Sequence, residues 1–178
     1  MLDIYATSID YDPKVEASQQ FFATVQNKMH WAAHGHTAAE IVHARADAGQ
    51  PNIGMTNWKG GKIRREEISI AKNYLNAEEL EALNLIVSLY LDFAELQARN
   101  RKPMTMRDWI TKLDDFLRLG DREILTHAGR ISHEQASLKA EVEFEKFRAQ
   151  QDALPSAVEQ HFEEAIRKLP SLKPKKDK

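Results

Sequence analysis

One local motif recurs along the chain and limits what it can fold into. A Ser, Thr or Asn is followed three residues later by an acid or a glutamine, and then by apolar residues at helical spacing. In this capping box the two side chains satisfy backbone N–H groups that a helix start leaves without partners. The five examples are Thr37-x-x-Glu40, Asn76-x-x-Glu79, Thr105-x-x-Asp108, Ser132-x-x-Gln135 and Ser156-x-x-Glu159.

The spacing of apolar residues gives the extent of each helix. A further helix opens at Asp12-Pro13, because proline suits the first helical position. Glycine- and proline-rich residues 50–62 indicate an irregular loop, and Ile68-Ser69-Ile70 keeps a strand possible at 66–75. The helix at 76–99 is apolar around most of its circumference and is expected at the centre of a bundle. The helices expected are 13–34, 37–48, 66–75, 76–99, 106–119, 121–128, 133–151 and 157–169.

Composition restricts the class of protein. The chain has 178 residues, 25 basic and 27 acidic side chains, and no cysteine. This length suits one domain, and the missing cysteines exclude a disulfide scaffold and fit a reducing cytoplasm. Near-neutral charge argues against a general nucleic-acid binder, and no apolar stretch is long enough for a bilayer. We predict an all-α single-domain bundle of about six or seven helices over 1–170, with one long central helix, and a basic, disordered tail over 171–178.

Three histidines crowd the turn between the first two helices: His30, His34 and His36. His30 and His34 share a helix face, Gly35 reverses the chain, and Thr37 starts a helix whose free N–H groups favour an anion. Three interpretations stay open. The histidines are structural caps, or His30 or His34 is a general base beside an anion site, or all three ligate zinc. A metalloprotease motif is excluded, because Trp31 stands where the glutamate base is needed.

A second candidate site is the loop that contains Trp58, Lys59 and Lys62 and continues into Arg64 and Arg65. Four basic residues and an aromatic ring within a few positions could grip a phosphate or stack on a base. The alternative is that Trp58 plugs into the bundle while the charges stay solvated. Three more residues could belong to the same site: Arg45, Asp47 and Asn73.

Six stretches together resemble the RhuM family of virulence-associated bacterial proteins, named from a pathogenicity-island protein. They are DIYATSIDYDP (3–13), FFATVQNKMHW (21–31), HTAAE (36–40), AKNYLN (71–76), YLDFAELQA (90–98) and PMTMRDW (103–109). Longer members carry an N-terminal region similar to phage antirepressor-type DNA-binding domains, so the chain looks like the C-terminal half alone. The resemblance implies virulence but no settled activity, and nucleic-acid binding only through that additional region.

A weaker similarity links the histidine turn to Fic-like domains. On that mapping His30 takes the catalytic position, and Gly35 with the following amides takes the anion loop. His34 then replaces an acid, His36 replaces an asparagine, and no arginine follows at once. The pattern therefore also allows a degenerate site that transfers nothing.

We expect an accessory or effector domain that binds a protein or a nucleotide-like ligand. The alternatives are a Fic-like nucleotidyl or phosphoryl transferase and a metal-dependent hydrolase. In the transferase, His30 is the base, the helix start at Thr37 binds phosphate, and a basic residue of 59–65 clamps it. A nucleotide is the more plausible cofactor and zinc the less plausible one. A homodimer is possible along the longest helix, and no membrane contact is expected.

Overall fold

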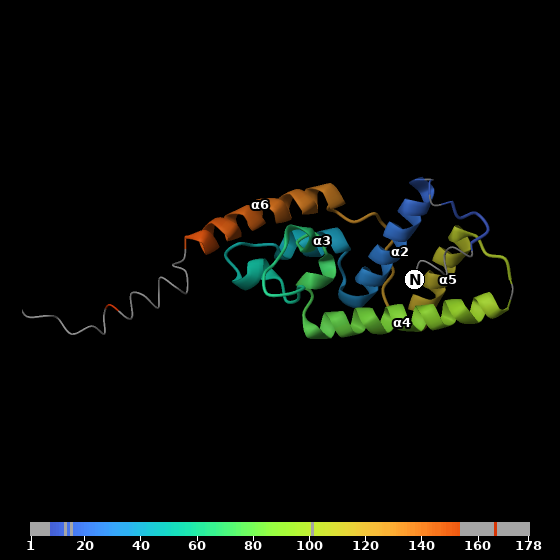
Figure 1. The fold of residues 1–178 in the computed structure, drawn as a ribbon. Coiled ribbons are helices and arrows are strands. Elements are labelled where there is room, and N and C mark those ends of the chain that lie inside the picture. Colours follow the sequence, from blue (N-terminus) through green and yellow to red (C-terminus); the bar gives the residue numbers. More distant parts are fainter. Residues whose placement is uncertain (1–7, 13, 15, 101, 154–165, 167–178) are drawn as a thin grey trace, which may run out of the picture.

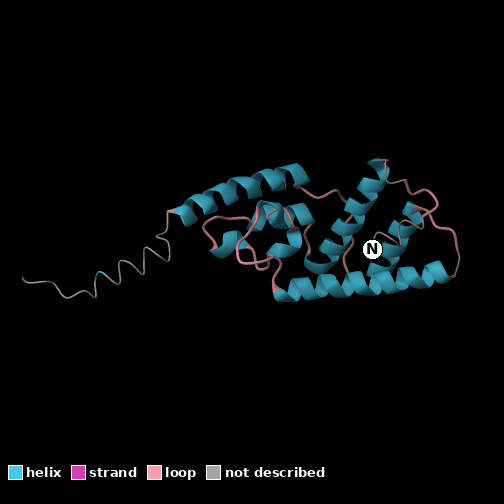
Figure 2. Ribbon diagram, viewed as in Figure 1, coloured by secondary structure: helices cyan, strands magenta, loops and turns pink. Residues whose placement is uncertain are grey.

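The computed structural model describes residues 8–12, 14, 16–100, 102–153 and 166. Within these ranges the helices are α2 (Glu16–His34), α3 (Ala38–Arg45), α4 (Ala77–Arg99), α5 (Met106–Leu119) and α6 (His133–Asp152). Three short 3₁₀-helices lie between α3 and α4: η1 (Pro51–Gly54), η2 (Arg65–Glu67) and η3 (Ala71–Tyr74). The described residues form no strand, which confirms the all-α prediction (Figure 2). They contain five α-helices instead of six or seven, and the expected helix at 157–169 falls almost wholly outside them, as does the tail.

The capping boxes are confirmed wherever the structure describes them. Four helix starts have both reciprocal bonds, from the cap side chain to the third helical N–H and from the third side chain back to the cap. The four cap residues are Thr37, Asn76, Thr105 and Ser132. The fifth box, at Ser156, lies outside the described residues. Helix starts are thus dictated locally, by side chains three residues apart.

Two expected helices are wrong because side chains take the backbone partners that a helix needs. Residues 66–75 form two separate 3₁₀ turns, and the Asn73 amide donates to the Glu67 carbonyl at 3.0 Å. Residues 121–128 are irregular, and the Leu125 carbonyl accepts from the Lys28 ammonium. In addition, α3 ends at Arg45 instead of near residue 48, because Ala48 N donates to the Glu143 carboxylate at 3.0 Å.

Helix α4 is the longest described helix, but it does not lie at the centre. In Figure 1 it runs along one edge of the molecule, with α2 and α5 packed against one part of it. Its buried side consists of Leu83, Ile86, Tyr90 and Ala94. Leu89 and Leu96, which contribute to the apolar pattern around this helix, are 47% and 56% exposed. The expected central helix is therefore a peripheral one with a single buried face.

The other end of the molecule is built on α3, which packs between α6 and η3 (Figure 1). Ala136 and Ala140 let α6 approach closely, and buried Glu143 reaches the loop after α3. With this side of α6 buried, Leu138 and Val142 face outward. No described helix is long and apolar enough to span a membrane.

Candidate functional site

The histidine turn is a compact hydrogen-bonded cluster. His30 Nδ1 and His34 Nε2 are 2.9 Å apart, and His36 Nδ1 lies 3.0 Å from the His34 carbonyl oxygen. Gly35 has φ +76°, the left-handed conformation that reverses the chain after α2. The sequence prediction that these three rings gather at one turn is confirmed.

Both bonded rings are poor bases. Burial, reinforced by the neighbouring His34, lowers the pKa of His30 to about 4. Burial also lowers the pKa of His34 to about 4, although Glu79 opposes this shift. His34 Nδ1 is buried and has no hydrogen-bond partner in the described part of the chain. A proton there would be an unsatisfied donor, so His34 Nε2–H donates to His30 Nδ1. The pair is neutral at pH 7, and the lone pair of His30 Nδ1 is occupied.

The start of α3 offers few free donors to an anion. Thr37 N donates to Glu40 Oε2 at 2.8 Å, and Ala38 N donates to Asn27 Oδ1 at 3.2 Å. Glu40 N donates to Thr37 Oγ1 at 3.3 Å, so the capping box uses the amides that the expected phosphate would need. The Glu40 carboxylate also brings a negative charge to this point. The geometry does not favour an anion here.

A hollow of about 380 Å³ lies beside the turn, but its lining differs from the predicted active site. His36 and Gly35 line it, together with His43 and Arg130, whereas His30, His34 and the basic residues of 59–65 do not. No group of three or more His, Cys, Asp or Glu in the described residues could hold a metal ion. The direct His30–His34 bond explains this, since a metal would have to separate those two nitrogens.

The predicted basic loop forms a different and better-developed site. A groove of about 630 Å³ separates this loop from the C-terminal half of α6. Lys62, Arg64 and Arg65 line one wall, and Arg148 lines the other. The remaining lining residues are Asn52, Trp58, Gly61, Ile63, Phe144, Phe147, Gln151 and Asp152. Four cationic side chains thus face one acid, Asp152, among aromatic rings.

A buried carboxylate holds the loop in shape. Glu67 accepts from Lys59 N at 2.6 Å and from Arg64 N at 3.0 Å. These two backbone bonds lower the pKa of Glu67, which therefore stays ionised. Lys59, which we expected at the site, does not line the groove. Its backbone N–H only donates to Glu67 and so helps to fix the loop.

The sequence left open whether Trp58 packs into the bundle or belongs to a ligand site, and the structure shows features of both. Its ring is half-buried and packs against the core, yet it also lines the groove. Arg65 lies 3.5 Å from Glu141, and Arg64 lies 3.7 Å from Glu66, both in exposed pairs. Such surface pairs contribute little, and a ligand can compete for these guanidinium groups.

Arg148 and Phe147 line this groove but were not among the site residues predicted from the sequence. The signal available was the spacing of Phe144, Phe147, Arg148 and Gln151, which lie on adjacent turns of one helix. Two of the further candidates are structural. Arg45 pairs with Glu79 through two 2.6 Å bonds, and Asn73 bridges η2 and η3.

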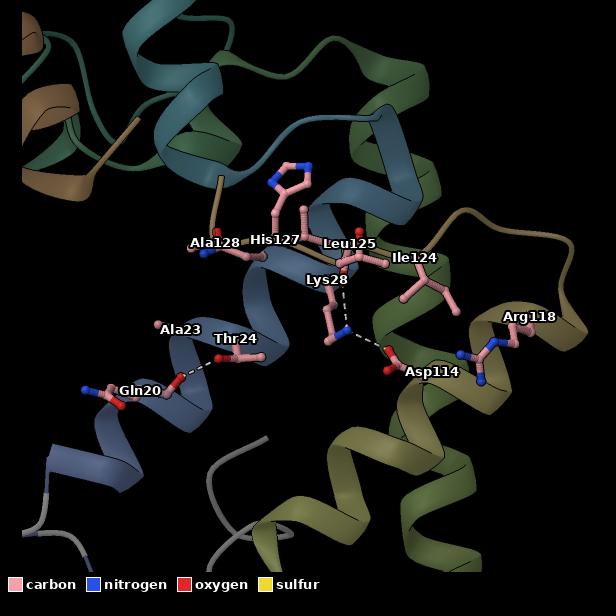
Figure 3. Close-up of a pocket in the computed structure, with 12 residues that line it drawn as sticks. Gln20, Ala23, Thr24, Lys28, Asp114, Arg118, Ile124, Leu125, His127 and Ala128 are labelled. Atoms are coloured by element: carbon pink, nitrogen blue, oxygen red, sulfur yellow. Dashed lines mark hydrogen bonds and ion pairs between the residues drawn. The ribbon is translucent and has the colours of Figure 1, made fainter. Parts of the chain in front are cut away.

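A third cleft, of about 760 Å³, lies between α2, α5 and residues 124–128 (Figure 3). On its floor the Lys28 ammonium lies 2.8 Å from Asp114 Oδ1 and donates to the Leu125 carbonyl at 2.9 Å. Lys28 falls on the buried stripe of α2 between Val25 and Ala32, which was the sequence signal for it. This lysine links three segments, through an ion pair with Asp114 and a hydrogen bond to the Leu125 carbonyl.

The fold and these sites define a class: an all-α protein with a surface groove lined by cationic and aromatic side chains. The chain belongs to the virulence protein RhuM family, whose family model matches residues 1–155. No match was found among curated proteins or among solved structures.

Proposed function

We propose that this RhuM-family protein is a binding module, and that the groove between the 58–65 loop and α6 holds an anionic ligand. One observation carries the proposal. Two segments more than 80 residues apart bring Lys62, Arg64, Arg65 and Arg148 around one hollow with Trp58. Its volume is in the range of small-molecule sites. The planar guanidinium groups of arginine can bind a phosphate or a carboxylate with two parallel hydrogen bonds. The Trp58 ring can pack against an aromatic or apolar group of the same ligand.

The histidine turn has a structural role in this proposal. The hydrogen bond from His34 to His30 joins two turns of α2, and the capping box of Thr37 fixes the start of α3. A general base works best with a pKa near the working pH, and the pKa values of this pair are about 4. Neither the transferase nor the metal-dependent hydrolase is therefore our preferred function.

The test is a titration followed by tryptophan fluorescence. Two probes are used: ADP, and a short peptide of glutamates. Binding in the groove changes the emission of Trp58, and Trp58→Phe removes that change while Trp31 and Trp109 keep the background. We expect Lys62→Glu combined with Arg148→Glu to weaken binding about 10- to 100-fold, because two charge-assisted contacts are lost.

Lys112→Glu is the matched control, since Lys112 is exposed on α5 and does not line the groove. It should leave the affinity within about twofold. The probe that binds distinguishes a nucleotide-like ligand from an acidic protein segment. The proposal is refuted if neither probe binds, or if Lys112→Glu weakens binding as much as the groove variant does.

A further inference from the structure

The outer side of α4 carries leucines that nothing in the described structure covers. Leu85, Leu89 and Leu96 are 57%, 47% and 56% exposed. They are separated by four and seven residues, so they lie on one stripe of the helix. The buried side of α4, at Leu83, Ile86, Tyr90 and Ala94, is a separate face. Helix α4 therefore has two apolar faces, and the described part of the chain buries only one of them.

The charges beside this stripe are arranged asymmetrically along the helix. Exposed Glu78 and Glu81 lie at its N-terminal end, whereas the exposed bases Arg99 and Lys102 lie at or just beyond its C-terminal end, following the exposed acids Asp92 and Glu95. Two such helices side by side in parallel would place like charges together. Side by side in opposite directions, they place each acidic end beside a basic end and also align their dipoles favourably.

We propose that two copies of this chain associate through α4, antiparallel, around a twofold axis near Ser88. Leu85 of one copy then lies beside Leu89 of the other, twice by symmetry, and the small Ser88 lets the helices approach. The same register places Glu78 opposite Arg99 of the second copy. It also places the exposed Asn84 opposite Asp92, to which an amide can donate.

One pair of like charges results from this register. Glu81 comes near Glu95 of the second copy, but Glu95 already lies 2.6 Å from Arg99 of its own chain. The α4 stripe is also remote from the groove. Helices α4 and α6 run along opposite edges of the molecule in Figure 1, so pairing through α4 leaves both grooves of the dimer open. A partner with two anionic segments would then gain from bivalent binding.

Sedimentation velocity on the full chain tests the association. The wild type should sediment as a dimer at micromolar concentrations. Leu89→Glu should raise the dissociation constant at least about 100-fold, because it buries two like charges beside the axis. Leu138→Glu is the matched control, since Leu138 is 63% exposed but lies on α6. It should leave the dimer intact, and circular dichroism should show both variants folded.

Cross-linking tests the register. Because the chain has no cysteine of its own, each introduced cysteine is the only thiol that can react. Ser88→Cys places two thiols near the axis, so mild oxidation should give a covalent dimer. Ser69→Cys, at an exposed position near η3, should not. A monomeric wild type overturns the proposal, as does an equal loss of dimer in Leu138→Glu. Equal cross-linking of the two cysteine variants also overturns it. These results are independent of ligand binding in the groove.

Discussion

Lys28 provides the sharpest test of how segments far apart in the sequence are held together. Its ammonium joins α2 to the Asp114 carboxylate of α5 and to the carbonyl of Leu125 (Figure 3). Lys28→Met keeps most of the aliphatic chain and removes the charge. The carboxylate and the carbonyl would then be left in the cleft without their partner.

The magnitude follows from the burial of the pair. Removing one member of a fully buried ion pair costs about 3–5 kcal/mol. The side chains of Lys28 and Asp114 are 11% and 20% exposed, so water at the mouth of the cleft offsets part of that cost. We expect a loss of about 2–3 kcal/mol in the free energy of unfolding. For a chain of this size the melting temperature should fall by roughly 5–10 °C.

The assay is urea denaturation followed by circular dichroism. Lys112→Met, an exposed lysine on α5, is the control and should change the free energy by less than about 0.5 kcal/mol. Asp114→Leu and the double variant complete a thermodynamic cycle. Because the double variant removes both charges, its loss should be smaller than the sum of the two single losses by about 1–2 kcal/mol. Additive losses, or a Lys28→Met loss equal to that of the control, would refute the clamp.

Two further predictions concern the histidine pair and a tight turn. Because the pKa values of His30 and His34 are lowered from 6.5 to about 4, the unfolded chain binds more protons between those values. The free energy of unfolding should therefore fall by about 2–3 kcal/mol after screening as the pH drops from 6.5 towards 4. In thermal melting, a double variant with His30→Gln and His34→Gln should show a weaker dependence of stability on pH. Gly54→Ala would place a Cβ 2.1 Å from the Arg45 carbonyl oxygen, whereas Gly60, with nearly the same φ, has open space around it. Chemical denaturation should show a loss of more than about 2 kcal/mol for Gly54→Ala and about 1 kcal/mol for Gly60→Ala, and equal losses would contradict the steric argument.

The sequence predicted which residues form the candidate sites only in part. The gathering of His30, His34 and His36 was predictable, because two of them lie one helical turn apart and Gly35 returns the third. The role of the cluster was not predictable, since the low pKa values come from burial by distant segments. Likewise, the basic loop was visible, but Arg148 on the opposite wall was not.

Errors in the predicted helices have the same origin. The apolar pattern at 66–75 and 121–128 suits a helix, but side-chain bonds compete for the backbone, as at the Tyr74 carbonyl, which accepts from Arg45. The Leu125 carbonyl is bound by Lys28, 97 residues away, and no local propensity reports such a partner. The position of α4 at an edge was hidden in a similar way, because an apolar pattern on two faces does not say whether one chain covers both.

The sequence by itself determined the fold class and the helix starts, because a capping box is closed by residues three positions apart and needs no tertiary contact. It also supplied the cations of the groove and the leucines of α4. Only the tertiary structure decided which of these residues meet. Burial lowered the pKa values of His30 and His34, the packing of α6 against α3 brought Arg148 to the groove that Lys62 lines, and the packing of α2 and α5 left one leucine stripe of α4 exposed. Each of these outcomes depends on chain segments far apart in the sequence, and their packing sets the local dielectric and the choice of partners.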